Sequence, residues 1–599
     1  MFSTRPIIKY ILAVLCGAAM LFSCCSCVDF DKVMDSLIGT ESQGSAVSRP
    51  SNDESTGDEV SVDMPYTAEG AFTVSPYGDG VAIDSYNGDE PYVKIPRTIG
   101  GKSVLAVNAN AVCDKTTEDG EATLVTVTHI IVPETVTVIA GGAFSGCKGL
   151  LSIELPFVGG TDGGGSFGYV FGGTVPDSLN DVVVGSKTIA DSAFEGCELL
   201  ESVILTEAET VGNGAFKNCK NLEKVVIPQS VTSMGSGLFD GCESLEELTL
   251  PYLGNGSDVV HVGYIFGAPD YKQNINYMPA SLNKLTVYME GVVPAYCFYE
   301  CDRLTSLTVK GNIKTLGEGS FYRCKRLKSI NLLGDEDFGG VNALGVGAFA
   351  YCSSLGEIRL SAELGAVPEK SFYSCSSLRS IYFGEELNKL PESVSSIGKS
   401  AFAYCESLSA LGLTEKITEI PDEAFVGCAY LTSVSIPKTV TSIGQNAFKG
   451  CSNLSSLSFE EGTRLTTIGD GAFAYCTLLK TVVLPESVSE LGSYVFSHCW
   501  SLNSASLPKA LTAIPDGCFF GCTVLKELQY GENKVSSIGE RAFSGCERIE
   551  SISLPSGIEN IGAHAFDECE KLVFTVSADT YAYDWLLKNG IGGTNLNLK

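Results

Sequence analysis

The dominant feature of the chain is a pattern of apolar positions that recurs about every 23 residues. A clear copy lies at 442–459, where the apolar positions are Ile443, Ala447, Phe448, Cys451, Leu454, Leu457 and Phe459. Written as a consensus, the unit is I-G-x-x-A-F-x-x-C-x-x-L-x-x-I-x-L-P. Periods of about 20–29 residues are typical of solenoid repeats built from short strands. The pattern therefore predicts one stacked structure and not several globular domains.

The repeat can be followed through most of the chain. Its Phe-x-x-Cys core occurs sixteen times between Phe144 and Phe566. Two long intervals each contain a degenerate copy, around Phe171 and Phe266. With these two added, twelve of the seventeen intervals between successive phenylalanines fall between 22 and 25 residues. This regularity predicts about 18 units.

Within one unit, the pattern predicts a strand, a bend and a short helical segment. Residues 433–436 alternate serine with an apolar residue, so one face of this strand is apolar and the other is polar. Gly444 permits a tight bend. The apolar residues of 447–454 are spaced so that they predict one or two turns of helix facing inward.

The energetics require these units to stack. One unit buries about six large apolar side chains, worth roughly 1.5–3 kcal/mol each. Ordering its backbone costs roughly 1–2 kcal/mol per residue, so a single unit is unstable alone. We therefore expect an α/β solenoid, a right-handed superhelix of about 18 units with short strands and short helical turns, capped at both ends. At about 4.8 Å per strand, it would form a rod about 90 Å long.

The segments that precede the repeats predict where in the cell the protein is located. Residues 1–23 contain Arg5, Lys9 and an apolar run over 11–22, which is too short to span a bilayer and is typical of a signal peptide. Residues 29–63 hold nine acidic and two basic residues, so 24–65 is expected to be an anchor site and flexible acidic tether.

The folded part of the chain follows this tether. We expect an N-terminal cap at 66–106, the solenoid at 107–576, and a capping helix with a tail at 577–599. Trp585 is expected to cover the last open face.

Cys24 is the expected lipidation site. The sequence Leu21-Phe22-Ser23-Cys24 resembles a bacterial lipobox, although Phe22 departs from it and Cys25 or Cys27 could be acylated instead. Diacylation with a third amide-linked chain would give stable anchoring. A plain cleaved signal with incidental cysteines is the alternative. The expected location is therefore across the inner membrane, lipid-anchored at the cell surface or outer membrane.

The repeat resembles the BspA-type (treponemal-type) leucine-rich-repeat surface proteins. The resemblance lies in I-G-x-x-A-F-x-x-C-x-x-L-x-x-I-x-L-P, which recurs from about Val107 to Val576. It implies attachment to host proteins such as fibronectin or fibrinogen, or to other bacteria. The chain has no asparagine ladder after the strand and instead carries a cysteine in the turn.

The cysteines and histidines predict no catalytic or metal site. One cysteine per turn produces a ladder and not converging ligands, so we expect buried free thiols, with disulfides between neighbouring turns as the alternative. The four histidines lie apart in the sequence and form no HExxH motif. We therefore expect no metal, no cofactor and no enzyme activity.

The polar side of the strands is the expected ligand face. Its candidate residues form two columns, Ser306, Ser329, Ser380, Ser433, Ser456, Ser504 and Ser551 beside Thr308, Asn331, Tyr382, Ser435, Ser458, Ser506 and Ser553. An ordinary solvated sheet is the alternative explanation. Exposed tyrosines in the two degenerate copies form a second candidate patch, at Tyr169, Tyr264, Tyr271 and Tyr277.

Charge narrows the choice of partners. The formal net charge of −31 disfavours nucleic acid, because a phosphate backbone would be repelled. The leading hypothesis is a monomeric, surface-exposed binding protein that attaches to host matrix or cell-surface proteins and touches the membrane only through its lipid. A structural envelope scaffold or spacer without a soluble ligand is the alternative. An enzyme built in the two degenerate copies is a third and weaker hypothesis.

Overall fold

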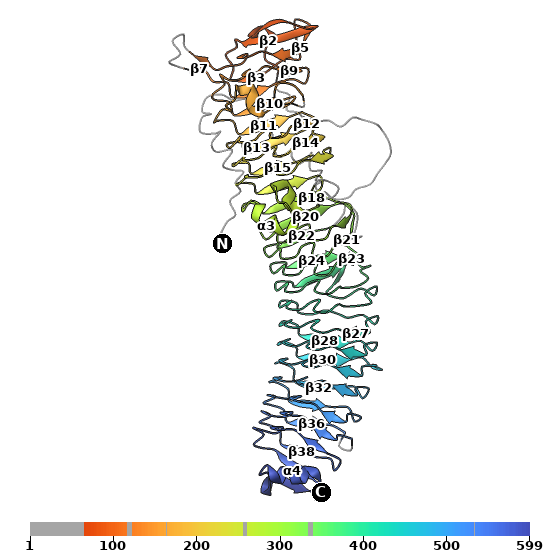
Figure 1. Ribbon diagram of the computed structural model, residues 1–599. Coiled ribbons are helices and arrows are strands. Elements are labelled where there is room, and N and C mark those ends of the chain that lie inside the picture. The colour runs from red at the N-terminus through yellow and green to blue at the C-terminus, as the bar shows by residue number, and fades with distance from the viewer. Residues whose placement is uncertain (1–64, 117–122, 163, 255–259, 333–339, 532–533) are drawn as a thin grey trace, which may run out of the picture.

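The computed structural model describes residues 65–116, 123–162, 164–254, 260–332, 340–531 and 534–599. Over these residues the chain forms one elongated solenoid of about 21 turns, with β2 near one end and α4 at the other (Figure 1). The expected signal segment and Cys24 lie outside the described residues. No helix within the described residues is long and apolar enough to cross a membrane.

The first ladder of strands runs along one side of the solenoid, with each strand parallel to its neighbour. Its N-terminal part is one ten-stranded sheet of β3 (Tyr92–Lys94), β8 (His129–Ile131), β10 (Ser152–Leu155), β11 (Asp181–Val184), β13 (Ser202–Leu205), β15 (Lys224–Val226), β17 (Glu247–Leu250), β18 (Lys284–Tyr288), β20 (Ser306–Lys310) and β22 (Ser329–Asn331). Its C-terminal part is divided into shorter sheets of β24 (Glu357–Leu360), β25 (Ser380–Phe383), β28 (Ser433–Ile436), β30 (Ser456–Phe459), β32 (Thr481–Val483), β34 (Ser504–Ser506), β36 (Glu527–Gln529), β38 (Ser551–Ser553), β40 (Val573–Val576) and β41 (Leu596–Leu598).

A second ladder of shorter parallel strands forms another side. Its members are β9 (Val138–Ile139), β12 (Thr188–Ile189), β14 (Thr210–Val211), β16 (Ser233–Met234), β19 (Gly291–Val293), β21 (Ile313–Leu316), β23 (Ala343–Leu344), β27 (Glu419–Ile420), β29 (Ser442–Ile443), β31 (Thr467–Ile468), β33 (Glu490–Leu491), β35 (Ala513–Ile514), β37 (Ser537–Ile538) and β39 (Asn560–Ile561). In the sixteen coils that have a Phe-x-x-Cys core, the segment that contains it closes the coil.

The N-terminal end is covered by an antiparallel hairpin. β1 (Phe72–Tyr77) follows the short η1 (Glu69–Ala71) and pairs with β2 (Gly80–Tyr86), which in turn pairs with β5 (Lys102–Val107) and so reaches β9. Four further short strands form antiparallel pairs. β4 (Thr98–Ile99) pairs with β5, β6 (Lys115–Thr116) pairs with β7 (Thr123–Val125), and β26 (Glu386–Leu387) pairs with β25.

The prediction of about 18 units is too low. Eighteen coils carry the phenylalanine that was counted, but β3, β8 and β41 belong to coils without a Phe-x-x-Cys core. β3 pairs with β8 at one end, and β41 pairs with β40 at the other. The stack therefore extends into 66–106 and 577–599, because strand pairing needs no particular side chain.

The prediction of a helical turn at 447–454 is wrong, because these residues form hydrogen-bonded turns. The backbone N–H of Phe448 donates to the carbonyl of Ala472 in the next coil, and that of Gly450 donates to Ala474. Asn446 and Gly450 lie in the left-handed region, with φ of 54° and 76°. A continuous right-handed helix cannot include such residues, and these donors serve neighbouring coils instead.

Gly444 has a different role from the expected bend. Its φ is not in the left-handed region, but a Cβ at this position would lie 2.5 Å from the backbone nitrogen of Asp422 in the preceding coil. The equivalent Gly469 and Gly492 meet the preceding coil in the same way. The glycine of the I-G pair is therefore required by close contact between coils.

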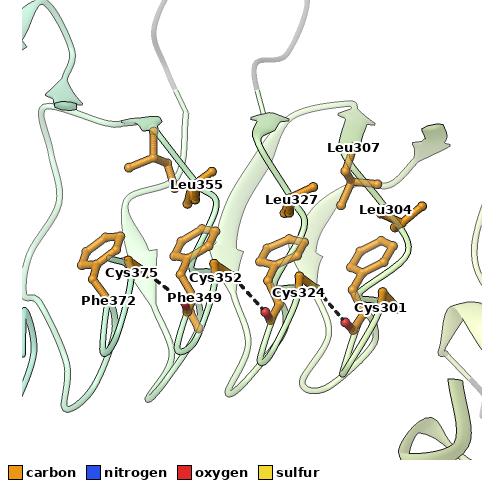
Figure 2. Close-up of a cluster of buried hydrophobic side chains, with 14 of the residues drawn as sticks. Cys301, Leu304, Leu307, Cys324, Leu327, Phe349, Cys352, Leu355, Phe372 and Cys375 are labelled. Atoms are coloured by element: carbon orange, nitrogen blue, oxygen red, sulfur yellow. Dashed lines mark hydrogen bonds between the residues drawn. The ribbon is translucent and has the colours of Figure 1, made fainter. Parts of the chain in front are cut away.

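One apolar core runs the length of the solenoid, and its centre is a column of phenylalanine rings. Phe402 stacks on Phe372 at 5.4 Å and on Phe425 at 5.5 Å, measured between ring centroids, with the planes nearly parallel. Leucines from each coil lie beside the rings, as for Leu327 and Leu355 (Figure 2). The continuous interior that the sequence predicts is present.

The cysteines form a second column inside the core. In thirteen described coils the thiol donates to the carbonyl oxygen of the phenylalanine in the preceding coil, at 3.1–3.4 Å from Sγ to O. Three of these bonds are drawn in Figure 2, including that from Cys352 to Phe321. The thiols are free, as predicted. They donate to buried carbonyl groups of the preceding coil, so the cysteine ladder links neighbouring coils through hydrogen bonds.

The two degenerate copies are closed by short helices. η2 (Phe167–Phe171) and η3 (Val262–Phe266) carry Phe171 and Phe266 into the ring column. η4 (Tyr271–Gln273) and α3 (Asn274–Tyr277) follow η3. The fully buried Asn274 accepts from the backbone N–H of Gly263 at 3.0 Å and donates to the carbonyl of Tyr299 at 3.1 Å. This side chain therefore connects the irregular copy to the next regular coil.

The C-terminal end is closed by α4 (Tyr581–Lys588), which is followed by η5 (Gly593–Asn595). Thr580 caps the helix by accepting from the N–H of Tyr583 at 3.3 Å. Trp585 lies edge-on to Phe566, the last ring of the column, at 6.2 Å between centroids. This contact places Trp585 where the last open coil needs cover.

Candidate functional site

The outward side of the first ladder is the polar strand face, the surface that the sequence picks out. All fourteen predicted residues point away from the core, and none of them is buried. Ser433 pairs in register with Ser456, and Ser435 with Ser458. Ser306 likewise pairs with Ser329, and Thr308 with Asn331. Flat strands of a stacked ladder hold these groups at fixed positions.

The two columns are less uniform than the prediction suggests. Ser380 pairs with Glu357, and Ser504 lies between Thr481 and Glu527. Tyr382 lies under the guanidinium of Arg359, at 4.1 Å from the charge to the ring centroid. The polar strand face therefore combines small hydroxyl groups with charged and aromatic positions, which gives it chemical variety along its length.

The N-terminal half of this face was missed by the sequence analysis. His129 and Glu154 lie on it, and Asp181 pairs between Ser152 and Ser202. Burial, followed by the nearby Glu201, raises the pKa of Asp181 to about 6. Burial also lowers the pKa of His129. The alternating residues of Ser152-Ile153-Glu154-Leu155 were the available signal, since they match the later strands.

A hollow opens in this face where the first ladder is interrupted between β30 and β32. Its volume is about 560 Å³, and its walls include the partly buried Leu457 and Phe459 and the 69% exposed Val483. Ser458, one of the predicted face residues, also lines it. The interval from Phe448 to Phe473 is 25 residues in this coil, and β30 and β32 belong to different sheets.

Carboxylates surround the hollow. Glu460, Glu461 and Glu486 line it, and no lysine or arginine does. Glu460 accepts from the backbone N–H of Lys438 at 3.0 Å, and Glu486 accepts from that of Lys509 at 3.0 Å. These bonds hold two of the three carboxylates at the rim. The arrangement joins an apolar wall to an acidic rim, which suits a basic and apolar partner.

The histidines are distributed among separate structural contacts. His261 is buried with its Nδ1 3.0 Å from Asn274 Oδ1, and burial lowers its pKa. His498 stacks on Tyr475 at 4.6 Å, and His564 contacts Asp567 at 2.7 Å. Within the part of the chain that the structure describes, no three His, Cys, Asp or Glu side chains are grouped as they would be around a metal ion.

The tyrosines of the degenerate copies do not form one patch. Tyr169 and Tyr277 are exposed on different copies, and Tyr264 is partly buried against the core. Tyr271 instead stacks on Tyr296 of the next coil at 5.0 Å. The second candidate patch is therefore divided between separate coils.

Comparison with known proteins identifies the repeat. A model of the BspA type leucine rich repeat region, in six copies, matches residues 123–160, 178–256, 291–390, 388–467 and 458–573. The chain belongs to the BspA-type leucine-rich-repeat family. This match agrees with the resemblance carried by the repeat motif. No protein with a curated description matches the chain.

The solved structures that match the chain include leucine-rich repeat proteins from several bacteria. A leucine-rich repeat protein from Bacteroides ovatus is 19% identical, with 88% of this chain and 98% of that chain covered and a TM-score of 0.24. A leucine rich cell surface protein from Faecalibacterium prausnitzii is also 19% identical, with 78% and 96% covered and a TM-score of 0.19. A leucine-rich repeat protein from Eubacterium ventriosum is 19% identical, with 62% and 83% covered and a TM-score of 0.30.

Proposed function

We propose that this BspA-type protein is a non-catalytic, surface-exposed binding protein that attaches to host matrix or cell-surface proteins through its polar strand face. The observation that carries the proposal is the hollow between β30 and β32, where an apolar wall and an acidic rim interrupt a rigid polar surface. Solenoids of this kind present long surfaces to partner proteins. An apolar side chain of the partner would fill the hollow, and its basic neighbours would meet the carboxylates.

We expect the partner to bind less tightly when arginine side chains fill the hollow between β30 and β32 and oppose the charge of its carboxylates. Ser458→Arg with Val483→Arg in the full chain should weaken binding to immobilised fibronectin or fibrinogen at least tenfold, about 1.4 kcal/mol. Gln445→Arg adds charge at an exposed residue outside the polar strand face and is the matched control. Surface plasmon resonance measures all three proteins.

Two outcomes would contradict this function. One is that the unchanged chain binds neither protein, nor whole host cells, above a chain with scrambled repeats. The other is that the face variant binds as well as the control. If removing a complete coil then altered the cell envelope while face variants did not, the spacer hypothesis would replace the proposal.

The proposal includes anchoring through Cys24. A lipid-bearing N-terminus followed by an acidic tether would hold the solenoid away from the membrane surface. Cys24→Ala is expected to abolish palmitate incorporation and to move the protein from the membrane fraction to the soluble fraction. Cys25→Ala and Cys27→Ala serve as controls and should leave both unchanged. Retained labelling in Cys24→Ala would assign the lipid to another cysteine.

A further inference from the structure

A row of tyrosines lies on the turn side of the solenoid, away from the polar strand face. It consists of Tyr299, Tyr322, Tyr351, Tyr373 and Tyr404, which come from five consecutive coils. Neighbouring rings are 5.2–5.5 Å apart between centroids. Each tyrosine follows a core phenylalanine by one or two positions, so it points outward while the phenylalanine points inward. We call this set the tyrosine row.

The rings change orientation along the row. Tyr299 and Tyr322 are parallel, with 2° between their planes, and so face each other along the solenoid axis. From Tyr322 onward the rings are crossed, by 72° to Tyr351, 62° to Tyr373 and 77° to Tyr404. Crossed rings cannot all face along the axis, so some ring faces are directed away from it.

A hollow of about 400 Å³ lies where the rings are crossed. Tyr351, Tyr373 and Tyr404 form its aromatic part. Its polar part consists of three serine hydroxyls with one cation and one carboxylate, from Ser353, Ser374, Ser376, Lys325 and Glu406. The site therefore combines aromatic rings with groups that donate hydrogen bonds and groups that accept them.

The backbone beneath the hollow is unusual for such large side chains. Tyr351 and Tyr404 lie in the left-handed region, with φ of 64° and 59°. The same position carries glycine at Gly427 and Gly450, but it also carries Arg323, Ser374 and Tyr475 in the left-handed region. A bulky residue in this region is uncommon and costs free energy. This conformation is therefore a property of the turn along the solenoid, and the case for the hollow depends on its ring arrangement and its lining.

We propose that the tyrosine row and its hollow bind a linear polysaccharide that runs along the solenoid axis. A sugar ring has an apolar C–H face that stacks on an aromatic ring, and a rim of hydroxyls that both donate and accept hydrogen bonds. The coil spacing is close to the length of one sugar unit in an extended chain. Successive sugars can therefore meet successive coils, with serine hydroxyls and charged groups beside them.

The composition of the hollow favours a sugar over a proline-rich peptide, the other common ligand of tyrosine-lined grooves. Proline has no backbone N–H, so such a peptide offers mainly carbonyl acceptors. The Glu406 carboxylate accepts hydrogen bonds only, and would lose its solvation without gaining a partner. Sugar hydroxyls can donate to Glu406 and accept from Lys325.

Affinity electrophoresis of the full chain tests this site. The gels contain hydroxyethyl cellulose, xylan, mannan or hyaluronan. At least one of these is expected to retard the protein, and Tyr351→Ala with Tyr404→Ala should reduce the affinity at least tenfold. Ser376→Arg, which fills the hollow without removing a ring, should do the same. Tyr430→Ala removes a 61% exposed tyrosine outside the row and should have no effect.

Further outcomes separate this site from the polar strand face. Ser458→Arg with Val483→Arg should retain polysaccharide binding, whatever it does to protein binding. The proposal is overturned if none of the four polymers retards the chain, or if the row variants migrate like Tyr430→Ala. It is also overturned if a decaproline peptide binds instead and the row variants abolish that binding. Circular dichroism melting establishes that each variant is folded.

Discussion

Replacing Phe402 by alanine is expected to lower the free energy of unfolding by about 3–5 kcal/mol, the usual cost of removing a buried aromatic ring. Phe402 is fully buried and stacks on a ring in each neighbouring coil. Its loss would remove two ring contacts and leave a cavity between coils that the rigid ladders cannot close. Urea denaturation followed by circular dichroism measures the change.

Tyr430→Ala is the matched control for this substitution. Tyr430 is an aromatic residue in the coil that follows Phe402, but it is 61% exposed, so its removal should change the free energy of unfolding by only about 0.5 kcal/mol or less. Similar losses for the two variants would mean that Phe402 does not lie in a packed column. Because each coil contacts only its neighbours, the loss of structure in Phe402→Ala should also be greatest in the coil that contains Phe402 and in the coils next to it.

The period of the repeat was enough to predict the solenoid, the ring column and the free thiols. A 23-residue spacing forces equivalent side chains to lie over one another, and an apolar residue at an inward position has no alternative site. The polar strand face followed from the alternation in strands such as 433–436. These inferences depend only on which residues face inward.

The features that were missed depend on contacts between coils. The helical prediction for 447–454 failed because the left-handed residue Asn446 and the donors to the next coil are not visible in an apolar spacing. Gly444 was assigned to a bend, although the preceding coil is what excludes a side chain. The coils of β3, β8 and β41 have no phenylalanine to mark them, so the predicted number of units was too low.

In the candidate sites, too, the features set by which residues face inward could be predicted, whereas those set by contacts between coils could not. Serine columns could be predicted from alternation, but the hollow beside Ser458 arises because β30 and β32 separate. The tyrosine row was not recognised, because its rings come from two positions of the motif. Tyr373 directly follows its phenylalanine, whereas Tyr404 is two residues beyond. Only the backbone conformation brings both onto one side.

Alkaline pH is expected to destabilise the fold through the cysteine ladder. Burial raises the pKa of Cys375, Cys428 and Cys499 to about 12, whereas in the unfolded chain the ordinary value is about 8.5. The folded state keeps these protons when the unfolded state has lost them. The stabilisation is therefore complete below about pH 8.5 and is lost as the pH rises toward 12, by about 1.4 kcal/mol per pH unit for each thiol.

Urea denaturation between pH 8 and 10 measures this effect, below the range in which ordinary tyrosines and lysines titrate, about 10 and above. The free energy of unfolding should fall steadily across this window. Cys428→Ala removes one titrating thiol and should give a shallower fall than the unchanged chain. A stability that does not change with pH would contradict buried, protonated thiols.

The central claim is that one continuous core, with a free thiol in nearly every coil, runs through the molecule. Alkylation with iodoacetamide at pH 8 without reductant, followed by mass spectrometry of each peptide, tests it most directly. We predict that the ladder cysteines from Cys219 to Cys546 stay unlabelled in the native protein and are all labelled in denaturant. Labelling of the native ladder would mean that the coils are open, and resistance in denaturant would mean that the cysteines are paired in disulfides.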